Sequence, residues 1–403
     1  MRIVSEAPPL LSLPEDQGPR EGWSLLPLGA VGVVFGDLGT SPLYAFKAAF
    51  AEPLFKAHDV GMAKAHDVGH LMGVLSLFLW SILIVICVKY VIFMMRADND
   101  GEGGVLAMFS LLQRKRQKSS RSFGRLSPRG VMVFLAIVGA ALLYGDGVIT
   151  PAISVLAAAE GINFAMGGTA PTWLAPLVAV GILILLFAMQ RFGTGAIGFL
   201  FGPIMLIWFV VIAALGVGGI MANPSVLMAI NPVWAINLFA GDPWMSFVVL
   251  GAVVLCITGC EALSLDMGHF GRNPIRITWF SFVFPALTLN YFGQGALILS
   301  DASNIKNPFY LMAPEWFTLP LVILATFATI IASQACITGA FSVSKQALQL
   351  GFIPRMRINH TSEEKEGQIY LPRINWILMI GVMSVVIIFQ NSSALASAYG
   401  IAI

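Results

Sequence analysis

The stretch VVFGDLGTSPLY, residues 33–44, places one carboxylate, that of Asp37, inside a long apolar run. Gly36 and Gly39 permit unusual backbone angles on both sides of the acid, and Pro42 removes an amide donor and disturbs the preceding turn. The stretch therefore predicts a helix that is broken around Asp37. Inside a membrane, the carbonyls freed by such a break are tolerated only around a polar cavity or a bound ion.

The composition is that of an integral membrane protein. Of the 403 residues, 57% are hydrophobic and only 11% are charged, and the mean hydropathy is +0.83. Soluble domains carry about a quarter charged residues. All four cysteines lie in apolar runs, which indicates buried, inert thiols rather than disulfides or a metal site.

Apolar runs long enough to cross a bilayer, roughly 20 residues each, recur along the whole chain. We number ten candidate spans in chain order. They cover residues 26–50, 70–95, 129–160, 172–190, 193–220, 244–265, 275–300, 316–347, 372–390 and 392 onward. The tenth, SSALASAYGIAI, stops about halfway across a bilayer, so we expect it to be incomplete and the natural chain to continue beyond residue 403.

The basic residues predict the orientation of these spans, because every second loop is basic and the intervening loops are nearly uncharged. The basic loops contain Arg96, Arg114, Lys115, Arg116, Lys118, Arg121, Arg125, Arg129, Arg272, Arg276, Arg355, Arg357, Lys365 and Arg373. By the positive-inside rule these loops and the N-terminal tail, residues 1–25, are cytoplasmic. The absence of a targeting signal favours a bacterial inner membrane.

Two other features of the loops have simpler interpretations than a binding site. The basic loop at 114–129 lacks interleaved aromatic residues apart from Phe123, so we expect no nucleic-acid partner. The outer loop contains a tandem repeat, KAHDVGMA-KAHDVGH, at residues 56–70. Its histidines and aspartates could bind a metal such as zinc, but a local duplication in a tolerant surface loop is the favoured interpretation.

Three acids lie at membrane depth, in spans one, three and six. Such groups are costly and survive where a cavity and a partner support them. In span one, Tyr44 follows Asp37 by about two helical turns and can face the same side. The simpler alternative for Asp37 is a proline kink in which the acid is hydrogen-bonded to a neighbouring helix.

Spans three and six each add hydroxyl groups to an acid. In YGDGVITPAIS, Asp146, Thr150 and Ser154 follow at i, i+4 and i+8, so they share one helix face. Hydroxyl groups alone would mean little, since Thr and Ser can bond back to their own helix. In LCITGCEALSL, Thr258 and Glu261 share a face, and Gly259 lies between them as an expected break.

Breaks in spans one and six of a ten-span chain suggest two five-helix halves, which we place at residues 26–220 and 221–403. Transporters built on inverted repeats bind their substrate at the midplane, where such interrupted segments meet. Carboxylates, hydroxyls, a phenol and free carbonyls are hard oxygen ligands, which suit an alkali ion. Several carboxylates in one cavity also favour proton exchange. No nucleophile–base pair lies at depth, so we expect no enzyme.

Six motifs together resemble the KUP/HAK/KT family of potassium-uptake permeases, from about residue 26 to the end of the chain. They are GVVFGDLGTSPLY (32–44), RADNDGEGGVLAMFSLL (96–112), YGDGVITPAISVLAAAEG (144–161), ITGCEALSLDMGHFG (257–271), LTLNYFGQGAL (287–297) and HTSEEKEGQIYLPRINW (360–376). The resemblance implies the LeuT-like 5+5 inverted repeat of the amino acid–polyamine–cation superfamily, with helices one and six broken. It also implies potassium import coupled to protons, with both ions as cargo and no resident cofactor.

The family's potassium sites map onto positions that the residues already indicate. The implied ligands are Asp37, Tyr44, Asp146, Thr150, Ser154, Thr258 and Glu261. The coupling proton is expected on one of the three acids, Asp37, Asp146 or Glu261. Family members usually continue with two further spans and a cytoplasmic region linked to dimer formation, which makes a homodimer in the lipid membrane an expected assembly.

Two rival functions remain open from the sequence. A passive potassium channel or uniporter would normally carry a filter like TVGYG, and the YGDGV sequence is a poor substitute. An amino-acid transporter of the same fold would present backbone amides of helix one to a substrate carboxylate, which the acid at Asp37 would repel.

Overall fold

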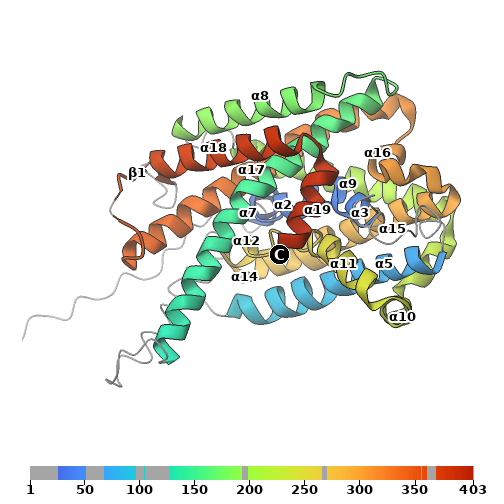
Figure 1. The fold of residues 1–403 in the computed structure, drawn as a ribbon, viewed down its shortest axis with the longest axis horizontal. Helices are drawn as coiled ribbons and strands as arrows, with labels where there is room; N and C mark the ends of the chain where they lie inside the picture. Colours follow the sequence, from blue (N-terminus) through green and yellow to red (C-terminus); the bar gives the residue numbers. More distant parts are fainter. Residues whose placement is uncertain are drawn as a thin grey trace, which may run out of the picture.

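The computed structural model describes residues 26–50, 68–96, 104, 128–192, 198–265, 270–354, 356–360 and 369–402. This part of the chain is almost entirely helical, and its long helices run side by side (Figure 1). Seven helical segments in it are long and apolar enough to cross a membrane, and they match seven of the ten expected spans. They are Val68–Arg96, Gly130–Ala165, Leu174–Phe192, Phe199–Ala222, Arg272–Ser300, Glu315–Gln349 and Pro372–Phe389.

Each of these spans is built from one helix or from helices that follow one another directly. Span two is α5 (Val68–Ser81) with η2 (Ile82–Phe93) and η3 (Met94–Arg96), and span seven is α14 (Arg272–Thr278) with η6 (Trp279–Val283) and α15 (Phe284–Ser300). The other spans contain α7 (Pro128–Ala165), α8 (Leu174–Met189) followed by η4 (Gln190–Phe192), α9 (Gly198–Ala222), α17 (Glu315–Gln349) and α18 (Pro372–Phe389).

Spans one, six and ten are made of shorter helices. Span one contains α1 (Leu26–Val33), α2 (Gly36–Thr40), η1 (Ser41–Leu43) and α3 (Ala45–Ala48), and span six contains α11 (Pro243–Val254) and α12 (Ala262–Leu265). Span ten is α19 (Ser392–Ala402). The predicted breaks in spans one and six are therefore confirmed.

The structure adds elements that the sequence analysis did not anticipate. Between spans five and six, η5 (Pro224–Ile230) and α10 (Val233–Gly241) form a pair bent by 78°. Between spans seven and eight lie η7 (Ala302–Lys306) and α16 (Pro308–Leu311). A two-residue antiparallel ladder of β1 (Asn359–His360) and β2 (Ile369–Tyr370) precedes span nine. Proline or asparagine begins most of these short helices, as expected at a helix start.

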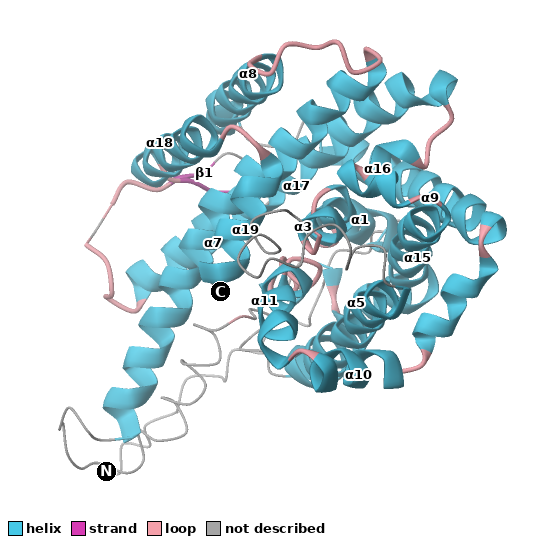
Figure 2. Cartoon of the chain, turned by 45° about the vertical axis from the view of Figure 1, so that its right-hand side comes forward, coloured by secondary structure: helices cyan, strands magenta, loops and turns pink. Residues whose placement is uncertain are grey.

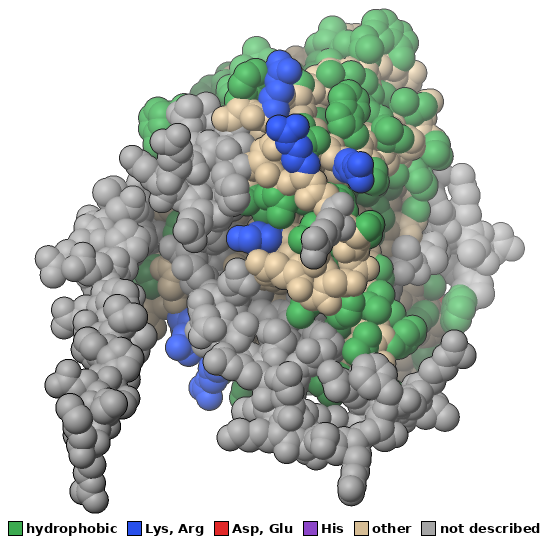
Figure 3. Space-filling model, turned by 90° about the vertical axis from the view of Figure 1, so that its left-hand side faces the viewer, with side chains coloured by type: hydrophobic (Ala, Val, Ile, Leu, Met, Phe, Trp, Pro, Cys, Tyr) green, Lys and Arg blue, Asp and Glu red, His purple; other side chains and the backbone are tan. Residues whose placement is uncertain are grey.

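Charged residues divide the molecule into two ends. The end that carries β1 bears most of the described basic residues, and Figure 3 shows Lys and Arg but no described Asp or Glu on that face. These residues are Arg96, Arg191, Arg272, Arg276, Lys345, Arg357 and Arg373. We call this end of the molecule the basic end. The outer surface between the two ends exposes large apolar side chains on α7, α8, α9 and α18, such as Phe134, Leu185 and Ile388, as a lipid-facing surface should.

The core is formed by the broken spans and the helices packed around them (Figure 2). Span one packs between α9 and α17, α7 crosses α17, and α9 packs along α15. Close backbone approach allows some of these contacts, because a Cβ added at Gly219 of α9 would lie 2.7 Å from the Gly293 carbonyl oxygen of α15. Small residues at such crossings are typical of membrane helices.

Candidate ion-binding site

The carboxylate of Asp37 is held inside the protein by the two breaks of span one. Helix α2, which carries it, is separated from α1 by Val34 and Phe35 and from α3 by η1 and Tyr44. Asp37 is only 2% exposed, and neither of its carboxylate oxygens has a hydrogen-bond partner among the described residues. The simpler alternative, a proline kink with the acid hydrogen-bonded to a neighbouring helix, has one candidate donor in the described part of the chain, the Cys336 thiol of α17, whose sulfur lies within 4.8 Å of an Asp37 carboxylate oxygen.

Most of the carbonyls freed around this break are taken by side chains. The Asp37 carbonyl accepts from the Thr40 hydroxyl at 3.0 Å and from the Ser41 hydroxyl at 3.4 Å. Trp208 Nε1 donates to the Gly39 carbonyl at 2.8 Å, and Gln294 Nε2 donates to the Pro42 carbonyl at 3.0 Å. One side chain of a neighbouring helix therefore donates to each of the Gly39 and Pro42 carbonyls, which leaves each oxygen one further lone pair. That free carbonyls supply ion ligands stays a prediction.

In span six the break lies where the sequence places it. Residues 255–261 leave the helix, and Gly259 has φ +78°, a left-handed conformation that favours glycine. A Cβ at this position would lie 2.8 Å from the Cβ and Cγ atoms of Asp37. The glycine thus lets the backbone of span six approach the acid of span one. Thr258 donates its hydroxyl proton to the Leu255 carbonyl at 3.0 Å, which leaves its oxygen able to accept.

In span three the acid and the hydroxyls share a face, as predicted. Thr150 donates to Asp146 Oδ1 at 2.8 Å, and Tyr399 of α19 donates to the same oxygen. Ser154 lies 3.5 Å from the Thr40 hydroxyl of span one. Span three is therefore joined to spans one and ten through its polar face.

One small cavity brings the three predicted acids together. It has a volume of about 40 Å³ and is lined by Asp37, Asp146 and Glu261. Three possible ligand atoms lie within 4.8 Å of one another: one carboxylate oxygen of Asp37, one of Asp146, and the sulfur of Cys336 on α17. A water molecule needs roughly 10–15 Å³ of such volume, and K⁺ is about as large as water, so the cavity admits an ion of this size.

The cavity extends from the acids toward the basic end of the molecule. Its apolar walls include Val33, Leu143, Leu265 and Gly339. Within its own span, each of these residues is nearer to the basic end than the acid or thiol of that span, as the helix directions in Figure 1 show. The other four predicted ligands, Tyr44, Thr150, Ser154 and Thr258, are buried but do not line this cavity. They lie around it, in the segments that follow or flank the acids.

On the opposite side of the acids, spans one, three and ten are joined by an ion pair. Lys47 Nζ of α3 lies 3.1 Å from Glu160 Oε2 of α7. The same carboxylate accepts from the backbone N–H and the hydroxyl of Ser392, both at 2.6 Å. Tyr310 of α16 donates to the carbonyls of Ala157 and Ala158 nearby. We call the three residues Lys47, Glu160 and Ser392 the outer lock.

Sequence reasoning missed two residues of the site, Tyr399 and Cys336. Tyr399 stands in SAYGIAI and Cys336 in SQACITG. A phenol within an apolar run was the signal available for Tyr399, since a buried tyrosine hydroxyl usually finds a partner. Nothing in the local sequence distinguishes Cys336 from the other three buried thiols. The Asp266 and His269 side chains and most of the 56–70 repeat lie outside the described residues.

Together these features define a multi-pass, all-helical membrane protein with acids gathered around an internal cavity. Residues 24–403 match the family model described as the K⁺ potassium transporter integral membrane domain. The chain therefore belongs to the potassium transporter family, and the resemblance to the KUP/HAK/KT permeases is confirmed.

Curated relatives cover most of this chain. It is 54% identical over 381 residues to the probable potassium transport system protein Kup 2 of Syntrophobacter fumaroxidans, which covers 94% of this chain and 57% of that protein. It is 52% identical over 381 residues to the Kup protein of Pseudomonas fluorescens (94% and 58%) and 53% identical over 387 residues to that of Pseudomonas putida (96% and 58%). The chain thus spans less than two thirds of their length. Their names are those of transport proteins and not of enzymes, in line with the sequence analysis.

Proposed function

We propose that this chain forms the ion pathway of a secondary active potassium importer that works as a potassium–proton symporter. K⁺ would bind at the midplane between spans one, three and six. Asp37, Asp146 and Glu261 would balance its charge, and the coupling proton would reside on one of them. The names of the relatives, which are those of potassium transport proteins, support potassium as the cargo.

The observation that carries the proposal is the buried Asp37 carboxylate without a hydrogen-bond donor among the described residues. A buried charge left unpaired costs about 3–5 kcal/mol. Among the described residues that line the cavity there is no lysine or arginine that could neutralise it. A transported cation or a proton removes this cost. In symport both ions are bound at once, so one of the three acids would carry the proton while the others balance the charge of K⁺.

The neutral oxygens around the acids suit an alkali ion. Tyr44, Thr150, Ser154 and Thr258 carry the hydroxyls expected as ligands, and all four are buried next to the broken spans. The Tyr44 hydroxyl lies 3.5 Å from that of Ser41. We propose that small movements of α2 and α3 bring these oxygens onto the ion as it binds. The Cys336 thiol is a softer group and contributes less to the binding of K⁺.

The packing of the helices supports an inverted repeat of residues 26–220 and 221–403. Contacts within the first half recur between the corresponding spans of the second half. Spans one and five pack together, as do spans six and ten. Spans three and four pack together, as do spans eight and nine. The contact between spans one and five and the contact between spans six and ten are both close approaches of two glycines. A Cβ at Gly32 would lie 2.5 Å from the Gly202 amide nitrogen, and one at Gly251 would lie 2.6 Å from the Gly400 carbonyl oxygen.

The two sides of the acids differ as alternating access requires. Toward the basic end the cavity is lined by apolar side chains, whereas on the other side the outer lock joins three spans. We propose that the basic end is cytoplasmic, by the positive-inside rule, that the N-terminal tail lies on that side in a bacterial inner membrane, and that the arrangement is closed to the outside. A homodimer would form through parts of the full-length protein.

The test is potassium uptake by the full-length protein in a bacterial strain that lacks its own uptake systems. Asp37→Asn is compared with wild type and with Asp242→Asn. The control removes a carboxylate that caps α11 through the Met245 N–H at 3.0 Å, a role that asparagine fills equally well. We expect wild type and Asp242→Asn to support growth at low potassium, and Asp37→Asn to insert into the membrane but fail.

A protonophore separates symport from its alternatives. We expect it to stop uptake of a potassium tracer by wild type. Uptake that persists without a proton gradient would show a channel or uniporter instead. If wild type inserts normally and moves no potassium at any concentration, the cation assignment is wrong, and an amino-acid substrate becomes the next candidate for this fold.

A further inference from the structure

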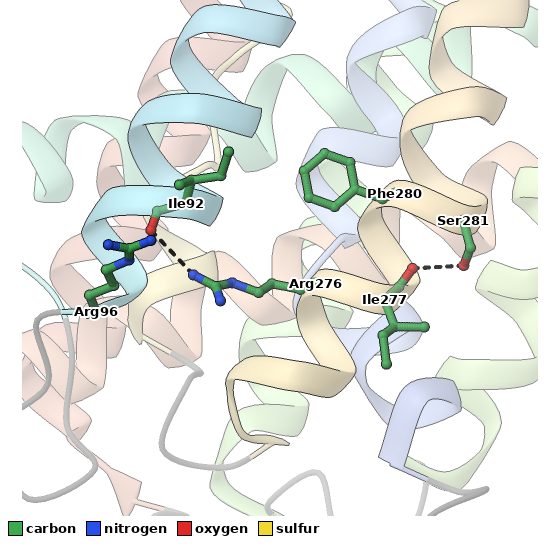
Figure 4. A pocket seen from close by; sticks show the side chains of 6 residues that line it. All are labelled: Ile92, Arg96, Arg276, Ile277, Phe280 and Ser281. Carbon is green, nitrogen blue, oxygen red and sulfur yellow. Dashed lines mark hydrogen bonds between the residues drawn. The ribbon is translucent and has the colours of Figure 1, made fainter.

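A pocket with a volume of about 610 Å³ lies on the outer surface at the basic end, between the end of span two and the start of span seven (Figure 4). It is lined by Ile92, Arg96, Arg276, Ile277, Phe280 and Ser281. It shares no residue with the cavity around the three acids. The ion pathway proposed above does not use it.

Arg276 fixes one wall of this pocket. Its Nε donates to the Val91 carbonyl at 2.9 Å and its Nη2 to the Ile92 carbonyl at 3.2 Å, so the side chain connects α14 to the end of η2. A guanidinium has five N–H donors, and two are used here. Three remain for a ligand, and the two backbone bonds hold them in place, which lowers the entropy lost on binding.

Arg96 stands on the other side of the pocket. Its guanidinium carbon lies 5.8 Å from the ring centre of Phe93, which turns the side chain along the surface of span two. Neither Arg96 nor Arg276 has a carboxylate partner among the described residues, and no acid belongs to the pocket lining. Two cationic groups therefore face one opening without a described counter-charge.

The rest of the lining is apolar and exposed. Ile277 is 63% exposed and Phe280 is 44% exposed, and both lie on span seven one helical turn apart. They point away from the protein core and along the surface that faces lipid. The pocket thus combines a site for a phosphate with a surface for a hydrocarbon chain. A free phosphate would need only the first of these.

We propose that this pocket binds the headgroup of an anionic phospholipid from the leaflet at the basic end. Arg96 and the three remaining N–H groups of Arg276 hold the phosphate, and one acyl chain lies against Ile277 and Phe280. Basic pockets between membrane helices on the cytoplasmic side are suited to such headgroups. A bound lipid would join spans two and seven beyond the two hydrogen bonds of Arg276.

The experiment measures lipid binding by the purified full-length protein in nanodiscs of phosphatidylcholine that contain a small fraction of labelled phosphatidylglycerol. Arg96→Gln removes one cation without breaking a hydrogen bond to any of the described residues. Arg272→Gln is the matched control, because Arg272 begins the same helix at the same end but does not line the pocket. Binding of labelled phosphatidylcholine serves as the reference for each protein.

We expect Arg96→Gln to weaken phosphatidylglycerol binding about fivefold, the effect of one basic side chain near a membrane surface, and Arg272→Gln to leave it close to wild type. A second variant, Arg276→Lys, keeps the charge but loses the planar fork, and we expect it to weaken binding as well. Its thermal unfolding in neutral lipid shows whether the fold is intact. If it unfolds early, Arg96→Gln alone decides the question.

Three results would overturn the proposal. If Arg272→Gln loses as much binding as Arg96→Gln, the preference comes from the general charge of this end and not from the pocket. If inorganic phosphate at low millimolar concentration displaces the lipid from wild type, the pocket binds free phosphate and the acyl chain contributes nothing. Equal binding of both lipids by wild type would also contradict it.

Discussion

The substitution Gly259→Ala tests whether the approach of span six to span one creates the site. Gly259 has φ +78°, and an added Cβ would lie 2.8 Å from the Cβ and Cγ atoms of Asp37. Alanine therefore has two effects here. It places an L-residue in the left-handed region, and it pushes the backbone of span six away from the acid that carries the proposed function.

The expected size of the effect follows from these two contributions. The left-handed conformation costs roughly 1–2 kcal/mol for a residue with a Cβ. Contacts below 3.0 Å to a buried side chain cannot relax without moving Asp37 or residues 255–261. If only the first cost weakens the binding-competent state, the apparent potassium affinity falls about 5- to 30-fold. The displacement of Asp37 adds to this loss.

The assay is the potassium dependence of uptake by the full-length protein, with the amount in the membrane measured for each variant. Gly168→Ala is the matched control, since Gly168 has φ +81° but open space around its Cβ position. We expect Gly168→Ala to transport normally and Gly259→Ala to need far more potassium. Unchanged potassium dependence in Gly259→Ala, at normal membrane levels, would refute the idea that this contact shapes the site.

Four further substitutions probe the groups around the acids and in the outer lock. Tyr399→Phe removes a donor to Asp146, and since hydrogen bonds to charged groups contribute about 1.5–3 kcal/mol, we expect at least a tenfold loss of apparent potassium affinity in uptake assays; normal affinity would show that the tyrosine has no role in positioning the acid. Glu160→Gln removes the negative charge and one of the two acceptor oxygens of the outer lock, and we expect the full-length protein to lose about 2 kcal/mol of stability, seen as a lower melting temperature. Lys47→Met should lower the stability less, because Ser392 still donates to the Glu160 carboxylate. A larger loss of stability in Lys47→Met than in Glu160→Gln would contradict this. Cys336→Ser replaces a soft group by a hard one, so competition between Tl⁺ and K⁺ uptake should shift toward K⁺, and an unchanged ratio would place the thiol outside the ion's reach.

The acids and the breaks could be predicted from the sequence because both are local signals. Gly36, Gly39 and Pro42 disturb the backbone within one turn of Asp37, and an acid in an apolar run is visible without a structure. The spacing of Asp146, Thr150 and Ser154 likewise fixes a shared helix face. These predictions need only helix geometry and the cost of burying charge.

The partners of these groups could not be predicted, because they come from distant parts of the chain. Tyr399 reaches Asp146 across 253 positions, and Trp208 reaches the Gly39 carbonyl across 169. The sequence shows that span one has carbonyls to satisfy but not which helix satisfies them. The short helices η5, α10 and α16 were also missed, since they are too short or too bent to be read as spans.

The two sides of the three acids are closed by different kinds of contact. If Asp37 binds the transported cation as proposed, it must exchange that cation with only one side at a time. The outer lock has an ion pair and two short hydrogen bonds to Glu160, whereas the walls toward the basic end are Val33, Leu143 and Leu265. Polar locks open when competing water or ions satisfy their groups, and apolar walls open by a change in packing. The two closures therefore respond to different events, which would allow binding of a cation and a proton to open the inner side while the outer side stays shut.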